Sequence, residues 1–516
     1  MNYENQSQRA IQGFNEFLNT PLETVLQQHL DKNPAAEIIK LFQDVAANVP
    51  AYQAFLREQQ INPDTIQSFA DFQKLPPLTK DNYLKCYPLA DFCRDGKIAS
   101  CDTIAASSGS TGKPTFWLRF FTDELQIATR FEQIFYDSFF ADTKSTLAVV
   151  CFALGTWVGG MFTTNCCRYL ASKGYPVTVI SPGTNKAEIL RVVSELSPNF
   201  EQTVLLGYPP FLKDVIDTGI ANSIEWQQYN IKFVMAGEVF SEEWRNLVGE
   251  RVGYINPCDD FASLYGTADA GVLGNETPLS ICIRQFLAKN PETARTLFGE
   301  SRLPTLVQYD PMNRFFEVIP NSIDSNSVNL NKGISRGTLL FSGDNGIPLV
   351  RYNILDNGGI ITYNAMLEFL SEHGFNPIEA LSNRRGVRNL PFVFVFGRSN
   401  FTISYFGANI YPENIKVGLE QPLIRDWVTG KFVMQIQEDA DKNSFLSVVV
   451  ELAPQVEASE DKKQTLADSI LTQLKRLNSE FANYVPSEYQ TPRIELLPMG
   501  ESEYFPQGVK HRYTRK

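Results

Sequence analysis

The residues best suited to chemistry form one short string, SSGSTGKP, at residues 107–114. Its hydroxyls, glycines and ammonium belong to Ser107, Ser108, Gly109, Ser110, Thr111, Gly112 and Lys113. Glycine allows positive φ and close backbone approach to a ligand, and exposed N–H groups and hydroxyls donate to phosphate oxygens. The string therefore favours a phosphate-binding loop, although a flexible Ser/Gly linker has the same composition. A Walker A loop is excluded, because two residues instead of four separate the glycines and Pro114 follows the lysine.

The overall charge indicates that any anion site must be local. The chain has 516 residues, with 58 acidic against 46 basic side chains and a formal net charge of −12. Nucleic-acid binders carry a basic footprint that this composition lacks. We therefore expect no nucleic-acid partner.

Cysteine and histidine are too sparsely placed for a metal module or a disulfide scaffold. The eight cysteines show no C-x-x-C spacing, and the three histidines are His29, His373 and His511. No G-x-S-x-G string accompanies them, which argues against a Ser-His-Asp hydrolase. Reduced thiols and an N-terminus without the pattern of a signal peptide predict a cytoplasmic protein.

An uncharged stretch between Lys144 and Arg168 is long enough to span about 30 Å of hydrocarbon as a helix. Its interior instead reads as a strand at 146–154, a turn at GTWVGG and a helix from Met161. We therefore expect no membrane insertion.

The elements around these residues predict an α/β protein in three regions. Residues 1–100 show apolar residues at three and four spacing and predict the helical N-terminal region of a large domain. In residues 101–398, β-runs such as TLAVVCFAL, QTVLLG and IKFVMAG alternate with helical stretches, which favours parallel βαβ units. Residues 399–516 combine β-runs with one charged helix and predict a separate, small α+β domain.

Further strings give the chain a family resemblance. They are YGTAD at 265–269, VRYNILD at 350–356, GRSNFTISYFGANIYPENI at 397–415, and Gly508 with Lys510. With SSGSTGKP, they resemble the adenylate-forming superfamily in its order. LPPLTKDNYLKCYPL at 75–89, TWVGG at 156–160, GTNKAEI at 183–189, GYPPFLK at 207–213 and AGEVFSEEWR at 236–245 are similar to the phenylacetate-coenzyme A ligase subfamily. The resemblance covers residue 50 to the end and implies a large N-terminal domain with parallel βαβ sheets and a small, mobile C-terminal domain.

The resemblance implies that residues 107–113 hold the β- and γ-phosphates of ATP. It places Tyr265, Gly266 and Thr267 near the nucleotide and assigns the fifth residue of that string to Mg²⁺. Here Asp269 is one methylene shorter than the family's glutamate, so the metal would lie closer to the backbone or bind through water. Ala268 lacks the hydroxyl that the family has at this position.

Other roles follow from the same resemblance. Asp356 would accept the ribose hydroxyls, and Arg398 would lie near the ribose and phosphate. Gly237 and Glu238 fall at the adenine and acyl pocket. Lys510 would bridge the substrate carboxylate and the α-phosphate, although Val509 separates it from the usual glycine. The remaining expectations are Asn400 as the hinge and Tyr136, Trp157 and Phe240 as aromatic walls of the acid pocket.

The resemblance implies an AMP-forming acid–thiol ligase that uses ATP and Mg²⁺. It would convert a carboxylic acid, expected to be aromatic, into acyl-AMP and pass the acyl group to coenzyme A. Two alternatives stay open at this point: transfer to an amine or another non-thiol acceptor, and a catalytically impaired relative that binds nucleotide for regulation. The oligomeric state is also open, a homodimer included.

Overall fold

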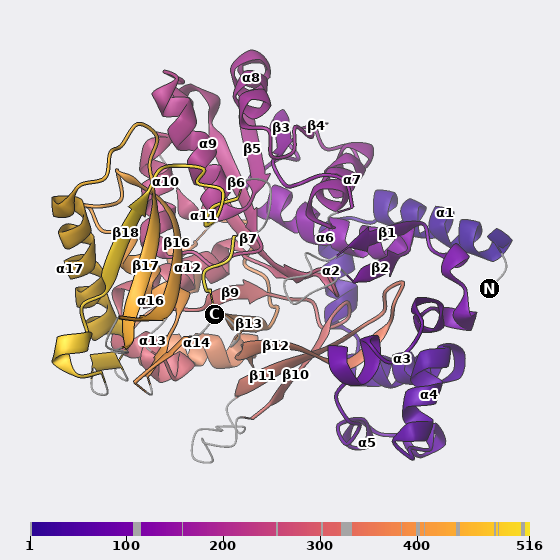
Figure 1. Ribbon diagram of the computed structural model, residues 1–516. Coiled ribbons are helices and arrows are strands. Elements are labelled where there is room, and N and C mark those ends of the chain that lie inside the picture. Colours follow the sequence, from indigo (N-terminus) through magenta and orange to yellow (C-terminus); the bar gives the residue numbers. More distant parts are fainter. Residues whose placement is uncertain are drawn as a thin grey trace.

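A large N-terminal domain and a small C-terminal domain make up the computed structural model (Figure 1). The structure describes residues 3–106, 115–156, 158–253, 256–300, 303–320, 333–382, 384–398, 403–406, 408–439, 444–478, 481–482, 485–506 and 511–515. In this part of the chain, no helix has both the length and the apolar character needed to cross a membrane.

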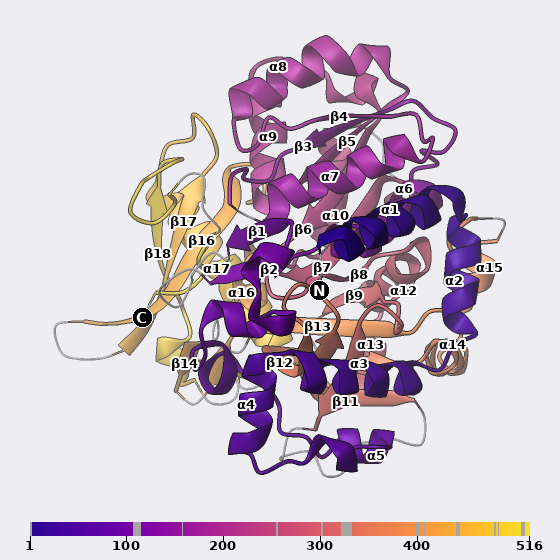
Figure 2. The same ribbon diagram turned by 90° about the vertical axis from the view of Figure 1, so that its right-hand side faces the viewer.

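The N-terminal region is helical, as its periodicity indicates. It contains α1 (Tyr3–Asn19), α2 (Leu22–Leu30), α3 (Pro34–Asn48), α4 (Pro50–Glu58) and α5 (Phe69–Phe72). On α3, Ile38, Phe42 and Val45 fall on one buried face, while Asn33 caps the helix by accepting from the amide of Ala35. Helices α3 to α5 pack beside β11 and β12, and α1 lies against α6 (Figure 2).

One half of the central eleven-stranded sheet is parallel, as the alternating pattern predicts. Its strands are β3 (Thr146–Val150), β4 (Val177–Ile180), β5 (Gln202–Gly207), β6 (Ile231–Ala236) and β7 (Phe261–Thr267), in the spatial order β4-β3-β5-β6-β7. The helices that connect them are α7 (Val158–Ser172), α8 (Lys186–Leu196), α9 (Pro209–Ala221), α10 (Glu242–Arg251) and α11 (Pro257–Asp260). The carboxyl ends of these strands share one edge, where side chains and turns converge.

The other half of the sheet is antiparallel, which the expectation of parallel βαβ units did not include. It contains β8 (Gly271–Asn275), β9 (Thr305–Gln308), β10 (Phe315–Ile319), β11 (Ile334–Gly343), β12 (Leu349–Ile361) and β13 (Phe392–Arg398), in the order β7-β8-β9-β13-β12-β11-β10. Short connections such as 268–270 and 344–348 join neighbouring strands, and a connection of that length permits only antiparallel pairing. The sheet is therefore mixed.

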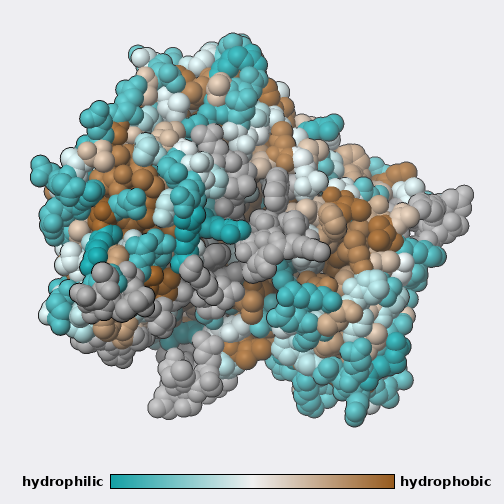
Figure 3. Space-filling view, viewed as in Figure 1, coloured by the Kyte–Doolittle hydropathy of each residue, from teal (hydrophilic) through white to brown (hydrophobic). Residues whose placement is uncertain are grey.

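The remaining elements of the large domain cover this sheet. They are the hairpin of β1 (Thr103–Ala106) and β2 (Phe116–Arg119), followed by α6 (Phe121–Asp137), α12 (Pro278–Lys289), α13 (Pro291–Phe298), α14 (Tyr363–Glu372) and α15 (Pro377–Ala380). Hydrophobic atoms gather on the surface over this hairpin, where Ile104 and Phe116 are exposed (Figure 3).

The small domain is α+β, as expected. It consists of β14 (Ile403–Tyr405), β15 (Ala408–Ile410), α16 (Pro412–Leu419), β16 (Val428–Glu438), β17 (Ser444–Leu452), α17 (Glu460–Leu477) and β18 (Arg493–Leu497). Strands β16 and β17 are antiparallel, and β18 pairs parallel with β17. Helix α17 buries Leu466, Ile470 and Leu474 at four-residue spacing, in one cluster with Val448 and Val450 of β17.

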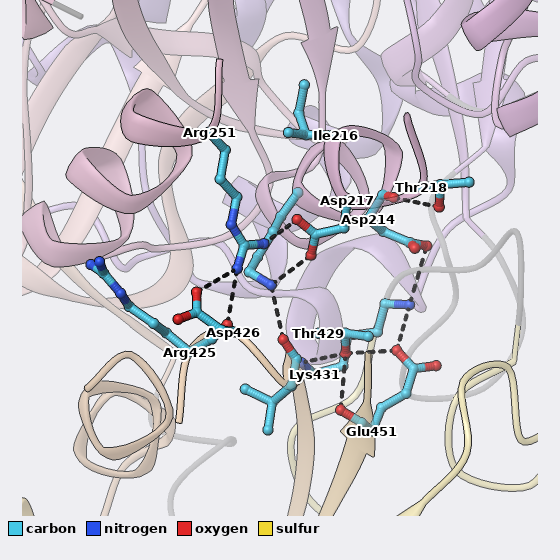
Figure 4. Close-up of polar contacts among 12 residues, drawn as sticks. Asp214, Ile216, Asp217, Thr218, Arg251, Arg425, Asp426, Thr429, Lys431 and Glu451 are labelled. Carbon is cyan, nitrogen blue, oxygen red and sulfur yellow. Dashed lines mark hydrogen bonds and ion pairs between the residues drawn. The ribbon is translucent and has the colours of Figure 1, made fainter. Parts of the chain in front are cut away.

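Charged side chains join the two domains beside α9 (Figure 4). The ammonium of Lys213 in α9 donates to Asp217 Oδ2 at 2.8 Å and to the carbonyl of Val428 in β16 at 2.9 Å. The guanidinium of Arg251 donates to Asp217, to the carbonyl of Arg425 at 3.1 Å and to Asp426 at 3.3 Å. Lys213 is only 2% exposed, so its bond to the small domain forms out of water.

A second group of interdomain contacts involves Lys431 of β16. Its ammonium lies 3.0 Å from Glu451 Oε2 and 3.8 Å from Asp214 Oδ2, so a cation of the small domain faces a carboxylate of α9. On the large-domain side, Lys186 also binds Asp214, at 3.1 Å.

Another interdomain contact contains a carboxyl with a shifted pKa. The hydroxyl of Ser241 in the large domain donates to Glu420, the residue after α16. Burial raises the pKa of Glu420 to about 7, against the favourable charge of Lys416. This contact should therefore respond to pH near neutrality.

Candidate functional site

A cavity of about 1110 Å³ lies where the carboxyl ends of β6 and β7 meet β12, β13 and the small domain. Seven residues expected at a nucleotide site line it: Gly237, Glu238, Tyr265, Gly266, Thr267, Asp269 and Asp356. Typical small-molecule pockets have about 300–1,000 Å³. The cavity is therefore large enough for a nucleotide together with a second group.

Two tyrosine–aspartate hydrogen bonds connect strands that are not neighbours in the sheet. Tyr265 of β7 donates to Asp356 Oδ2 of β12 at 2.7 Å, and Tyr352 of β12 donates to Asp269 Oδ2 after β7 at 2.8 Å. In each strand the tyrosine precedes the aspartate by four residues. Both carboxyls are at most 5% exposed. The bonds therefore hold two acidic groups in fixed orientations at one cavity, which is the arrangement a ligand with several polar groups requires.

Two arginines position the turn that carries Asp269. Arg119 Nη2 donates to the carbonyl of Ala268 at 2.6 Å, and Arg314 Nη2 donates to the carbonyl of Ala270 at 3.1 Å. Burial lowers the pKa of both guanidiniums, that of Arg314 to about 10. The backbone of Ala268 thus has a defined contact even though its side chain lacks the family's hydroxyl.

Glycine is required where this turn begins. A side chain at Gly266 would place its Cβ 2.6 Å from the carbonyl oxygen of Gly271 in the paired strand, closer than real contacts allow. Inside the turn, the hydroxyl of Thr267 accepts from the amide of Ala270 at 3.1 Å. Close backbone packing and a local side-chain bond therefore keep the turn in one conformation.

Asp356 and Arg398 are paired in the register of β12 and β13, and Asn357 pairs with Gly397. The backbone therefore brings together the two positions that the resemblance assigns to the ribose. Gly397 lines the cavity with φ of +90°, a conformation that glycine adopts readily.

Gly237 and Glu238 follow β6 and face the small domain. Gly237 has φ of +85°, and a Cβ there would lie 2.8 Å from the ring of Tyr208. The carboxylate of Glu238 accepts from the hydroxyl of Tyr513, and burial next to this carboxylate raises the pKa of Tyr513 well above its usual value. Lys416 of α16 donates to the carbonyl of Val239 at 2.7 Å. Small-domain side chains thus close this side of the cavity.

The C-terminal tail pairs with β16 and reaches the cavity. The amide of Met434 donates to the carbonyl of Tyr513 at 2.8 Å, and His511 Nε2 lies 2.7 Å from the carbonyl oxygen of Phe432. Burial lowers the pKa of His511. Residues 511–513 line the cavity, directly after Lys510 in the chain.

Several expected site residues lie outside the described part of the chain. They are the string Ser107–Lys113, Trp157, Asn400, Gly508 and Lys510, and the side chain of Arg398 is also not described. The chain on both sides of the string is described: Ala106, Thr115 and Phe116 all line the cavity.

Two aromatic residues expected in the acid pocket are elsewhere, which corrects those assignments. Tyr136 packs with Leu390 at α2, where the guanidinium of Arg385 lies 4.5 Å from the ring centroid. Phe240 is buried with Trp244, and the guanidinium of Arg245 lies 4.9 Å from its ring. Phe240 is thus buried in a core, and Tyr136 packs half-buried against a small hydrophobic cluster.

Other aromatic residues line the cavity: Phe131, Phe152, Phe162, Tyr208 and Phe211. The rings of Phe152 and Tyr208 meet edge to face, with centroids 5.0 Å apart. Sequence reasoning missed this set, although Phe152 follows β3 at the carboxyl edge where ligand residues are expected. Tyr352 and Lys80 were also missed, although each lies within a string that carried the family resemblance.

A search of protein-family models finds no match to the chain, and a search of curated proteins also finds none. Among solved structures, 2-hydroxyisobutyryl-CoA ligase in the postadenylation state, in complex with R3-HIB-AMP, matches with a TM-score of 0.65 and 14% identity. The alignment covers 93% of this chain and 89% of that one. The same ligase with 2-HIB-AMP and CoA in the thioesterification state matches with a TM-score of 0.52, 15% identity and the same coverage.

At this identity the likeness establishes the fold. This chain has the fold of adenylate-forming CoA ligases, with a large N-terminal and a small C-terminal domain. The expected fold class is therefore confirmed.

Proposed function

We propose that this protein uses ATP to convert a carboxylic acid into acyl-AMP with release of pyrophosphate, and then transfers the acyl group to the thiol of coenzyme A. The observation that carries the proposal is the pair of buried carboxyls, Asp269 and Asp356, held by reciprocal tyrosines in one cavity between two domains. The fold shared with a CoA ligase supports it.

The nucleotide would lie across the carboxyl ends of β7 and β12. A carboxylate accepts from both ribose hydroxyls, which is the role we assign to Asp356. Gly237 and Glu238 would border the adenine. The string Ser107–Lys113 would reach the phosphates, because the chain on both sides of it lines the same cavity. Arg398, in register with Asp356, would contribute charge near the ribose.

The residues at Asp269 fit a magnesium ion bound mainly by the substrate. Asp269 is buried at the cavity, and Oδ2 already accepts from Tyr352, which leaves Oδ1 as a ligand. Mg²⁺ commonly takes one or two carboxylates and completes its octahedron with phosphate oxygens and water. The metal would offset charge on the phosphates, while Tyr352 and Arg119 fix the carboxylate and its turn.

An acid with a planar aromatic group suits the apolar part of the cavity. Phe131, Phe152 and Phe162 come from different elements and border the same space as Tyr208. Edge-to-face contacts with an aromatic ring add to the burial of its apolar surface. We therefore retain an aromatic acid as the proposed substrate, with this set replacing Tyr136 and Phe240.

The described arrangement of the two domains supports a role for the tail in acyl-AMP formation. The chain matches the postadenylation state of the neighbouring ligase with a TM-score of 0.65, against 0.52 for the thioesterification state. The tail residues next to Lys510 line the cavity in this arrangement. We therefore propose that Lys510 serves acyl-AMP formation, that residues 399–516 rotate about Asn400 for thioester formation, and that the protein acts in the cytoplasm.

The test is pyrophosphate release over a panel of aromatic and aliphatic acids, with and without coenzyme A, and with Asp356→Asn as the inactive control. We expect acid-dependent release that Asp356→Asn reduces, and thioester only when coenzyme A is present. Release without thioester, but with product from added amines, would replace coenzyme A by another acceptor. ATP binding without turnover on any acid would refute the enzymatic proposal.

A further inference from the structure

The cavity contains a lysine that neither the phosphate-loop string nor the C-terminal tail supplies. We propose that Lys80 binds an oxyanion of the substrate opposite Asp269, either a phosphoryl oxygen of the nucleotide or the carboxylate of the acid. This inference rests on the proposed function. It adds a cation from the helical N-terminal region to a site otherwise built by β7, β12 and the small domain.

The backbone that carries Lys80 is fixed to the strand that carries Asp356. The amide of Leu78 donates to the carbonyl of Arg351 at 3.0 Å, and the amide of Asn353 donates to the carbonyl of Leu78 at 2.8 Å. These bonds make a short parallel bridge between residue 78 and Tyr352 of β12. The chain is therefore attached to β12 at Leu78, only two residues before Lys80.

Two further contacts make this attachment rigid. The guanidinium of Arg351 donates to the carbonyls of Gln73 and Leu75 and is paired with Glu317 at 3.0 Å. Thr79 caps the turn at Lys80–Leu84 through reciprocal bonds with Asn82. Arg351 adopts φ of +50°, an unusual conformation for a side-chain-bearing residue, and these contacts compensate for it. A backbone segment held by this many contacts can keep the side chain of Lys80 in one position for binding.

The ammonium of Lys80 keeps its donors for a ligand. Its nitrogen lies 3.9 Å from Asp269 Oδ2, beyond hydrogen-bond distance, and that oxygen already accepts from Tyr352. No protein acceptor is within hydrogen-bond distance of this nitrogen in the described part of the chain. The ammonium of Lys80 therefore lies near the carboxylate of Asp269 without donating a hydrogen bond to it.

The other lysines of the cavity lining differ from Lys80 in this respect. Lys85 lies 2.6 Å from Asp81 and its side chain is 70% exposed, against 33% for Lys80. Lys416 donates to a carbonyl at 2.7 Å. The protein has a net charge of −12, so an anionic substrate needs local cations at its binding site. A partly buried ammonium whose N–H groups have no protein acceptor can supply such a cation.

Lys80 and Asp269 line the same cavity with 3.9 Å between the ammonium nitrogen and Oδ2, so a substrate oxyanion would bind the ammonium from the cavity side and not between the two groups. The carboxylate belongs to the turn assigned to the magnesium ion, and an ammonium makes strong hydrogen bonds to phosphoryl and carboxylate oxygens alike. The two sources share one chemistry and differ in which ligand loses affinity when the charge is removed.

The test compares Lys80→Met, which removes the charge and keeps the length, with Lys80→Arg and with the matched control Lys74→Met, a lysine of the same region that pairs with Asp71 at 3.0 Å and does not line the cavity. Calorimetry measures the Kd of ATP, AMP and adenosine, and pyrophosphate release measures KM for the acid. If Lys80 binds phosphate, Lys80→Met weakens ATP binding by about 10- to 100-fold and leaves adenosine binding unchanged, and AMP binding weakens as well if the α-phosphate is the partner. If it binds the carboxylate, nucleotide affinities stay constant and KM for the acid rises by a similar factor.

Lys80→Arg should recover part of the loss in either case, and Lys74→Met should behave as the unmodified protein. The inference is refuted if Lys80→Met retains the affinities for ATP and AMP and also the acid KM. It is also refuted if AMP and adenosine lose affinity equally, which indicates a structural role. Absence of any nucleotide binding by the unmodified protein would instead refute the proposed function, so the two failures are distinguishable.

Discussion

Replacing Lys213 with methionine should loosen the attachment of the small domain. The ammonium is the donor that crosses from α9 to the carbonyl of Val428, and methionine keeps the apolar stem while removing this bond. Asp217 still has Arg251 as its partner, so the large domain should stay folded. The change therefore acts mainly on the contact between the domains.

The magnitude follows from the burial of the bond. Because Lys213 is 2% exposed, water cannot replace the lost donor while the domains remain in contact. A hydrogen bond to a charged group contributes about 1.5–3 kcal/mol. The ratio of attached to detached small domain should therefore fall by about 10- to 150-fold, since 1.36 kcal/mol corresponds to a factor of ten.

The assay is energy transfer between dyes at two exposed helical positions, Ser194 in α8 and Gln464 in α17. Lys173→Met is the matched control, because Lys173 is also buried and donates to Glu132 and to the carbonyl of Thr20, both at 2.8 Å and both within the large domain. We expect Lys213→Met to shift the distance distribution and to slow acyl-AMP formation. If Lys213→Met, like Lys173→Met, gives the distribution of the unmodified protein, the bond to Val428 does not hold the small domain.

Three other predictions concern the same site. Lys510→Ala should slow acyl-AMP formation about 100-fold while sparing acyl transfer from supplied acyl-AMP, and equal loss in both half-reactions would remove the assignment. Phe211→Leu should raise KM for the acid several-fold, whereas Tyr136→Leu should not, because the first ring lines the cavity and the second does not. Attachment of the small domain should weaken as the pH rises from 4.5, the ordinary pKa of Glu420, through about 7, its pKa when buried. Over this range the carboxyl holds a proton while the domains are attached and loses it when they separate, so rising pH favours separation. Glu420→Gln should flatten this dependence in the same energy-transfer assay, and an unchanged pH profile would contradict it.

The sequence alone predicts the elements and the general plan of the fold. The runs at β3, β5 and β6 are short, apolar and separated by helical patterns, and these local features suffice for parallel βαβ units. The C-terminal pattern likewise predicts an α+β domain. The sequence did not predict the antiparallel half of the sheet, because the direction of strand pairing depends on how short connections fold back and not on the composition of each strand.

The site is divided in a similar way between sequence and structure. Motif strings predict Asp269 and Asp356 as the acidic groups of the candidate site, because the residue type alone tells that a carboxylate is present. That Tyr265 reaches Asp356 while Tyr352 reaches Asp269 depends on the tertiary arrangement of the sheet, in which the non-adjacent strands β7 and β12 border one cavity.

Aromatic residues show the limit most clearly. Phe240 and Phe152 are equally apolar in the sequence, yet one is buried beside Trp244 and the other lines the cavity. Lys80 likewise cannot be distinguished from Lys85 by composition, because only the bridge between Leu78 and β12 directs one of them toward Asp269. The sequence by itself determined which chemical groups this protein has and which elements carry them. Their meeting at one cavity was decided by tertiary packing, since contacts between distant segments depend on the whole arrangement of strands and domains.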